Sequence, residues 1–91
     1  MDTRRLPYLV ELARLGSMRA VAERLQTSTS SVSQQIAALA REAGAPLVEP
    51  DGRRVRLTPA GRRLADHARE ILAAVDAARN DLEPHGEPAG T

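Results

Sequence analysis

The sequence contains no cysteine, no phenylalanine, no tryptophan and a single tyrosine among its 91 residues. The absence of cysteine excludes disulfide frameworks, zinc ribbons and thiol catalysis. Without large aromatic side chains, the core of one small domain must be built from alanine, leucine, valine and isoleucine. Lysine is also absent, so all 13 basic residues are arginine. The arginine guanidinium group can fork onto a phosphate or onto the edge of a guanine.

The net charge of +1 hides an uneven distribution along the chain. Residues 1–65 contain eleven arginines and six acidic residues, whereas residues 66–91 contain two arginines and six acidic residues. A basic body followed by an acidic segment indicates a polyanionic partner for the body. The sequence has neither the run of roughly 20 apolar residues that a membrane span needs nor a signal-peptide stretch near its start. We therefore expect a cytoplasmic protein without a membrane partner.

Two short helices are predicted near the start of the chain. Apolar residues at helical spacing predict a helix over 6–15, with a proline in its first turn and Gly16 as a left-handed stop. Ser17 is a capping residue for the second helix, which we expect over 18–26. The buried side of this second helix should include Ala20, Val21 and Leu25.

A third helix and a hairpin are predicted to follow. Ser28 caps the third helix, which spans 28–43 and ends before a glycine and a proline. Its inward face is marked by Val32, Ile36 and Leu39. The period changes over 47–57: apolar residues alternate with arginines at 54–57, directly after the turn signal Pro50-Asp51-Gly52, and this predicts a β-hairpin. Such a hairpin is marginal alone and must pack on the helices.

The last predicted helix is too long for the body that precedes it. Thr58 caps it, Pro59 takes its first position, and it continues to about residue 83, or roughly 36 Å. Apolar residues recur at steps of four and three, a pattern typical of a seam between two helices, and we expect this seam to join two subunits as a homodimer or a higher oligomer. The predicted interface consists of Leu64, Ala68, Ile71, Leu72, Val75, Ala78 and Leu82.

The order helix, short helix, turn, helix, hairpin predicts a mainly α-helical winged helix-turn-helix, followed by a long dimerisation helix. We divide the chain into a DNA-binding domain at 1–58, a linker helix at 59–83 and a hinge or flexible tail at 84–91. The outer face of the third helix has short, uncharged hydrogen-bonding side chains, which let its backbone approach base edges in double-stranded DNA. The expected base contacts are Thr29, Ser30, Ser33 and Gln34, and the expected phosphate contacts are Ser17, Arg19, Ser28, Arg53 and Arg54.

At these residues the sequence resembles the N-terminal domain of the LysR-type bacterial transcriptional regulators. The resemblance is collinear from Leu6 to about Leu82. It implies a nucleoid-associated dimer that binds a pseudo-palindromic operator and pairs through its last helix. The motifs that carry it are Gly16-Ser17, Ala22-Glu23-Arg24-Leu25, Ser33-x-Gln35-Ile36, Leu39, Gly44-x-Pro46-Leu47 and Arg53-Arg54-Val55-x-Leu57-Thr58-x-Ala60-Gly61.

Several positions depart from the usual pattern of that family. Met18 and Val48 stand where the family often has phenylalanine, which thins the core. Thr29-Ser30 replaces a Gln-Pro pair, and Gln34 and Pro50 each replace a frequent arginine. These changes shorten or neutralise groups that usually read bases or phosphates, so we expect a different operator preference.

The sequence gives less support to other functions. Asp66 and His67 are neighbours on one helix and point in different directions, and no nucleophile or metal-ligand cluster accompanies them. We therefore expect no enzyme, no catalytic residue, no metal and no cofactor. A protein-interaction winged helix, or another winged-helix repressor such as a molybdate-responsive regulator, remains the alternative. The resemblance implies that a small-molecule inducer acts only through an effector domain, which this sequence does not contain.

Overall fold

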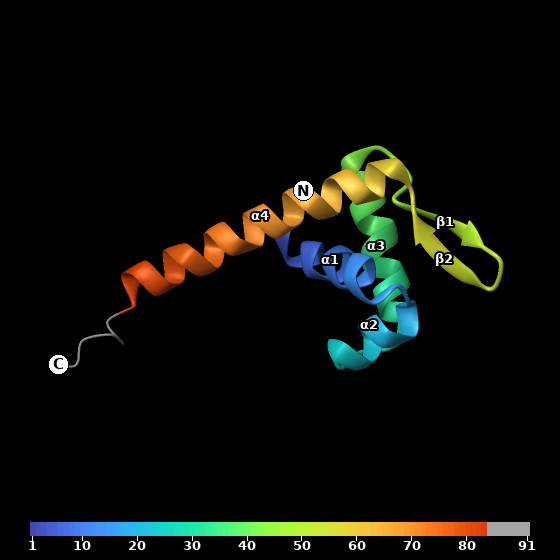
Figure 1. Ribbon diagram of the computed structural model, residues 1–91, viewed down its shortest axis with the longest axis horizontal. Coiled ribbons are helices and arrows are strands. Elements are labelled where there is room, and N and C mark those ends of the chain that lie inside the picture. Colours follow the sequence, from blue (N-terminus) through green and yellow to red (C-terminus); the bar gives the residue numbers. More distant parts are fainter. Residues whose placement is uncertain (84–91) are drawn as a thin grey trace.

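The computed structural model describes residues 1–83 (Figure 1). Four helices and a two-stranded antiparallel hairpin follow one another in the predicted order, which confirms the mainly helical winged helix-turn-helix with a long final helix. None of the helices in this described part is long and apolar enough to cross a membrane. The elements are the 3-10 turn η1 (Thr3–Arg5), α1 (Leu6–Leu15), α2 (Met18–Arg24), α3 (Thr29–Ala43), β1 (Val48–Asp51), β2 (Arg54–Leu57) and α4 (Pro59–Leu82).

Local sequence signals set the starts of three helices. The hydroxyl groups of Ser17, Ser28 and Thr58 accept hydrogen bonds from backbone N–H groups in the first turns of α2, α3 and α4. Each cap satisfies a donor that has no partner inside its own helix. Gly16 and Gly44 end α1 and α3 in the left-handed conformation, as expected for helix stops.

The end of α2 differs from the prediction. The helix stops at Arg24, two residues before the expected end, because Gln26 takes a left-handed conformation with φ of 56°. The N–H groups of Gln26 and Thr27 donate to carbonyls of the last turn, a Schellman ending with glutamine in the place that glycine usually takes. The buried residues of α2 are Val21 and Ala22, whereas the expected Ala20 and Leu25 are only half-buried.

Two adjoining aliphatic clusters form the core, which confirms the expectation of a core without large aromatic side chains. The fully buried residues of α3, predicted from their spacing, are Val32, Ile36 and Leu39. One cluster joins α1, α3 and α4, and the other joins α1, α2 and α3, with residues of the hairpin at its edge. Full burial of each leucine or isoleucine contributes roughly 1.5–3 kcal/mol.

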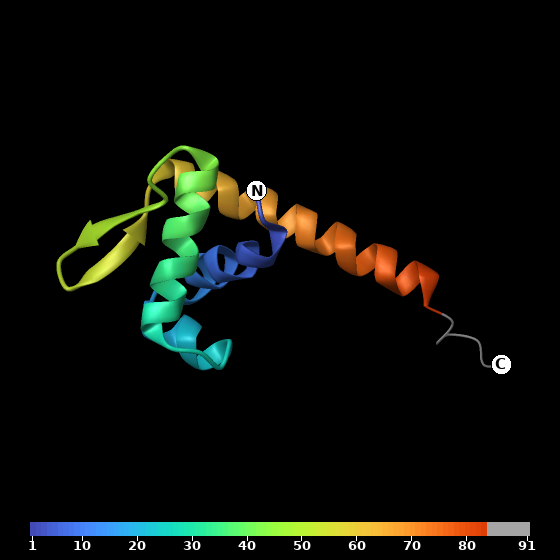
Figure 2. The ribbon, with the colours of Figure 1, turned by 180° about the vertical axis from the view of Figure 1, so that it is seen from behind.

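The hairpin leaves the body as a wing. Val48 pairs with Leu57 at its base and Asp51 pairs with Arg54 near its tip, so Gly52 and Arg53 form a two-residue turn. Of these two turn residues only Gly52 has a positive φ, the pattern of a type II′ turn. Figures 1 and 2 show the wing and the distal half of α4 pointing away from the body in opposite directions.

The first half of α4 belongs to the body. Ala65 and Ala68 are fully buried in the same cluster as Leu6 and Leu9 of α1. Beyond Leu72 the residues of α4 are exposed, which agrees with a helix that is longer than the surface available to it. The predicted hinge at 84–91 lies outside the described residues.

Candidate nucleic-acid interface

The outer face of α3 presents the four residues predicted to contact bases. Thr29, Ser30, Ser33 and Gln34 are all exposed. Within residues 1–83 these four side chains form no hydrogen bond or ion pair, so their donors and acceptors face solvent. The opposite face of α3 is fixed in the core, and the outer face is therefore held rigidly in position.

A depression of about 450 Å³ separates the start of α3 from the wing. It is lined by the turn between α1 and α2, by the first residue of α3 and by the tip of the hairpin. Segments that lie far apart in the sequence meet here. The predicted contact residues that line it are Ser17, Arg19, Thr29, Arg53 and Arg54.

The two predicted serine contacts also hold their helices. The Ser17 hydroxyl accepts a hydrogen bond from the Ala20 N–H at 3.1 Å, and the Ser28 hydroxyl accepts one from the Ser31 N–H at 3.0 Å. A hydroxyl that accepts in this way still has its own hydrogen to donate. Capping and donation to a phosphate oxygen are therefore compatible at both serines.

The arginines at the wing tip carry charge that is not neutralised locally. Arg53 and Arg54 are exposed, and neither has an ion-pair partner among the described residues. Arg19 lies 3.5 Å from the carboxylate of Glu23, but both side chains are largely exposed. Exposed pairs of this kind contribute about 0–1 kcal/mol, so a phosphate can compete for Arg19.

A network that the sequence did not predict fixes the other end of α3. Arg5 donates from Nε to Oε1 of Gln35 at 3.1 Å and also forms an ion pair with Glu42. The backbone N–H of Asp2 donates to Glu42 at 3.0 Å. Gln35 lies beside the buried face of α3 and Gln34 opposite it, but the sequence contains no signal that identifies Arg5 as the partner of Gln35.

The predicted dimer seam on α4 divides into two parts. Ala68 is 0% exposed within one protomer, and this corrects the expectation that it contacts a second one. Leu64 and Leu72 are partly buried against the same core. The residues left open to a partner are Ile71 at 37%, Val75 at 40% and Leu82 at 80% exposure, together with the exposed Ala78.

Helix α2, the turn at Gln26, helix α3 and the adjoining hairpin together define a winged helix-turn-helix domain. Residues 3–62 match the family of bacterial regulatory helix-turn-helix proteins of the lysR type. Because this match covers more than half of the chain, the protein belongs to the LysR family. Within residues 1–83, no group of three or more histidine, aspartate or glutamate side chains is arranged to hold a metal ion.

Relatives of known name agree with this assignment. The chain is 41% identical over 75 residues to the HTH-type transcriptional regulator TfdT of Cupriavidus pinatubonensis. The aligned region covers 82% of this chain and 33% of TfdT. It is 32% identical over 88 residues to the transcriptional dual regulator GltC of Bacillus subtilis, covering 97% of this chain and 29% of that protein. The chain therefore spans about a third of the length of these relatives.

Solved structures share the fold over nearly the whole chain. The CbnR DBD–DNA complex superposes with a TM-score of 0.83 at 33% identity, covering 89% of this chain and 93% of that one. The complex of BenM DBD with catB site 1 DNA superposes with a TM-score of 0.86 at 28% identity, covering 100% of both chains. Both of these similar proteins are bound to DNA in their structures.

Proposed function

We propose that this chain is the sequence-specific DNA-binding part of a homodimeric bacterial transcriptional regulator that acts on chromosomal DNA in the cytoplasm. The observation that carries the proposal is the juxtaposition of an exposed, uncharged, hydrogen-bonding face on α3 with the wing-tip arginines, which have no ion-pair partner within residues 1–83. The DNA complexes of the two similar structures support it. The proposal assigns no catalytic residue and no cofactor.

In this proposal, α3 enters the major groove and the wing holds the phosphate backbone. Gln34 can form two hydrogen bonds with one adenine, and the hydroxyls of Thr29, Ser30 and Ser33 meet neighbouring bases. Arg53 binds phosphates, and such contacts fix the position of α3 without reading the sequence. The absence of charge at these four positions of α3 favours bases over phosphates as their ligands.

A protein-interaction function is less consistent with the same face. A winged helix that binds a protein through α3 needs apolar side chains on the outer surface of that helix. The residues there are serine, threonine and glutamine, and the apolar residues Val32 and Ile36 point into the core. Burying these hydroxyl and amide groups against a protein without partners for each of them costs free energy.

The exposed part of the α4 seam supports the homodimer. Ile71, Val75 and Leu82 form an apolar stripe that a single protomer leaves in water. Pairing two such stripes removes them from water and places two copies of α3 on one duplex. A dimer of this kind reads two half-sites about 34–36 Å apart, in successive major grooves.

The direct test is selection of bound duplexes from a random DNA pool, followed by fluorescence anisotropy with the selected duplex and a scrambled duplex at several salt concentrations. We expect a recurring pair of inverted half-sites, tighter binding to the selected duplex, and affinity for both duplexes that falls with salt. Failure to bind any duplex at low salt would falsify the proposal. Equal affinity for the selected and scrambled duplexes would show that the protein binds DNA without sequence specificity.

A further inference from the structure

Two further depressions follow the one beside the wing tip. A second depression of about 310 Å³ shares Gly16, Arg54 and Val55 with it, and lies between the end of α1, the strand β2 and the start of α4. A third, of about 340 Å³, shares Ala13 and Arg62 with the second and follows α4. We call the second and third depressions together the wing–α4 groove.

The wing–α4 groove is lined by arginines that come from two elements. Arg54 and Arg56 come from β2, and Arg62 and Arg69 come from α4. Arg56 is paired with Glu49 at 3.0 Å, and Arg69 is paired with Asp66 of the preceding turn. Arg54 and Arg62 are exposed, and within residues 1–83 neither has an ion-pair partner.

Acidic side chains cancel only part of this charge. Asp51 lines the second depression and has no ion pair within the described part of the chain, so its negative charge offsets one of the two unpaired arginines. Asp66 lines the third depression and is held by Arg69. The groove therefore has an excess of positive charge that begins at the wing tip and ends at Arg62.

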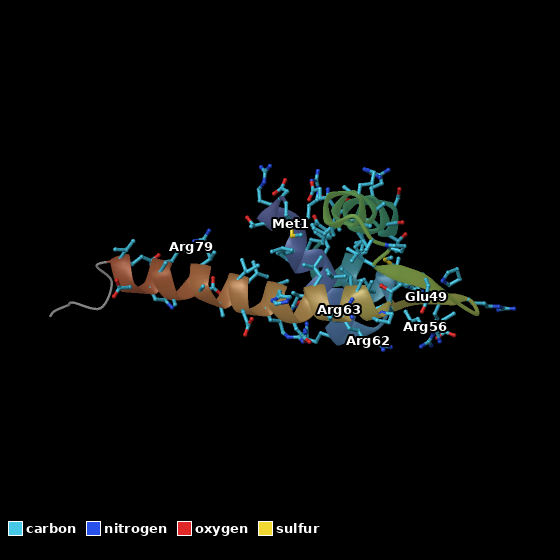
Figure 3. The ribbon with its side chains drawn as sticks, turned by 90° about the horizontal axis from the view of Figure 1, so that it is seen from above. Met1, Glu49, Arg56, Arg62, Arg63 and Arg79 are labelled. Carbon is cyan, nitrogen blue, oxygen red and sulfur yellow. The ribbon has the colours of Figure 1, made fainter. Side chains whose placement is uncertain are left out.

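A dimer formed through α4 leaves this groove open. At 100° per residue, Arg62 and Arg69 lie on one side of the buried residues of α4, and Ile71, Val75 and Leu82 lie on the other side. Arg63, which follows Arg62 in the sequence, points away from both the groove and the apolar stripe. Figure 3 shows Arg62 along the same edge of the molecule as Arg56 of the wing, whereas Arg63 lies over the helix.

We propose that the wing–α4 groove binds the phosphate backbone of the DNA that flanks the half-site, with Arg54 and Arg62 as its contacts. The inference rests on the proposed function and extends it beyond the base pairs that α3 covers. The groove adjoins the depression between α3 and the wing, with Arg54 in the wall of both, so one backbone can follow one and then the other. A flank that follows the groove must bend toward the base of α4, and the arginine–phosphate interactions formed there offset the cost of bending.

The test compares two duplexes and two arginine variants in the full 91-residue chain. One duplex is the selected half-site alone, and the other carries about ten further base pairs on each side, roughly one helical turn. Arg62→Ala removes a groove contact, and Arg63→Ala is the matched control, with the same side chain on the same helix turn. Anisotropy titrations over a range of salt concentrations measure affinity and its salt dependence, and circular dichroism confirms that both variants are folded.

We expect Arg62→Ala to lower affinity roughly three- to fivefold on the long duplex and to leave the short duplex unchanged. The slope of log affinity against log salt on the long duplex should fall by about 0.9, the value for one phosphate. Arg63→Ala should match the wild type on both. Equal behaviour of the two variants, or an equal loss on both duplexes with Arg62→Ala, overturns the inference. Failure of the proposed function gives a different result, since the wild type would then bind neither duplex.

Discussion

Gly61, in the first turn of α4, lies directly against the backbone of Leu47, at the start of the wing. A Cβ atom at position 61 would meet the Leu47 carbonyl oxygen at a distance that real structures do not show, and would lie 3.1 Å from the carbonyl carbon. The same carbonyl accepts a hydrogen bond from the Thr58 N–H at 3.0 Å. The Thr58 hydroxyl donates to the Pro46 carbonyl at 2.7 Å. These contacts fix the angle between the wing and α4.

Replacing Gly61 with alanine should therefore destabilise the protein, although alanine is the better helix former. In an exposed helix the change would add about 1 kcal/mol of stability. Here the added methyl group pushes α4 away from Leu47, and overpacking of this kind costs about 1–3 kcal/mol. Thermal and urea unfolding followed by circular dichroism measure the difference. A higher unfolding midpoint in Gly61→Ala would show that α4 can move away from the Leu47 backbone without loss of stability.

The carboxyl group of Asp2 gives a prediction about pH. Hydrogen bonds from the Arg4 guanidinium group, and then from the Arg4 N–H, lower its pKa from 3.8 to about 2. Because the folded pKa lies below the unfolded one, this stabilisation is complete above about pH 3.8 and is lost as the pH falls through about 2. An NMR titration of the Asp2 carboxyl should show the low value in the wild type. In Arg4→Ala it should return toward 3.8, and an unchanged titration would contradict the role of Arg4.

Features that depend on neighbouring residues in the sequence were predictable, and features that depend on tertiary placement were not. The starts of α2, α3 and α4 follow from Ser17, Ser28 and Thr58, because a cap acts on its own first turn. The end of α2 could not be predicted, because Gln26 adopts the left-handed conformation that usually requires glycine.

The same distinction applies to the candidate sites. Spacing identifies Ala68 and Ile71 equally as apolar positions of α4, but only the packing of α1 decides that Ala68 is covered by its own protomer. The wing–α4 groove has no local signature, since Gly16, Arg54 and Arg62 come from separate elements. Helical spacing places Gln34 on the outer face of α3 and Gln35 nearer its buried face, but the contact that Arg5 makes with Gln35 depends on tertiary placement.

Removing the charge of Arg53 should weaken DNA binding without changing sequence preference. Arg53 stands in the turn of the wing, and its proposed ligand is a phosphate, which every sequence presents. Arg53→Ala should lower affinity for selected and scrambled duplexes by similar factors and reduce the salt slope by about 0.9 for each protomer bound. Arg79→Ala, on the exposed distal part of α4 (Figure 3), is the control and should bind like the wild type. A loss confined to the selected duplex would assign Arg53 to base reading instead.

Removing the amide of Gln34 should change the sequence preference and leave the salt dependence of binding unchanged. Gln34 is exposed on the outer face of α3, and its proposed ligand is one adenine. Gln34→Ala should relax the preference at a single base pair of each half-site, worth about 1–3 kcal/mol, with the salt slope unchanged. Repeating the selection with this variant identifies the position. Gln35→Ala is the matched control, because that amide is engaged by Arg5, and it should retain the preferred base. An unaltered preference in Gln34→Ala would show that Gln34 reads no base.

The oligomeric state should depend on the exposed half of the α4 seam. Ile71 is 37% exposed in the protomer, so a charge placed there is tolerated by one chain but not by a helix pair that buries it. Ile71→Asp should shift the mass in solution from dimer toward monomer and weaken binding to the two-half-site duplex more than binding to a single half-site. Ala77→Asp introduces the same charge on the outer side of α4, away from the seam, and should remain dimeric. Sedimentation equilibrium separates the two variants, and a dimeric Ile71→Asp would place the interface elsewhere.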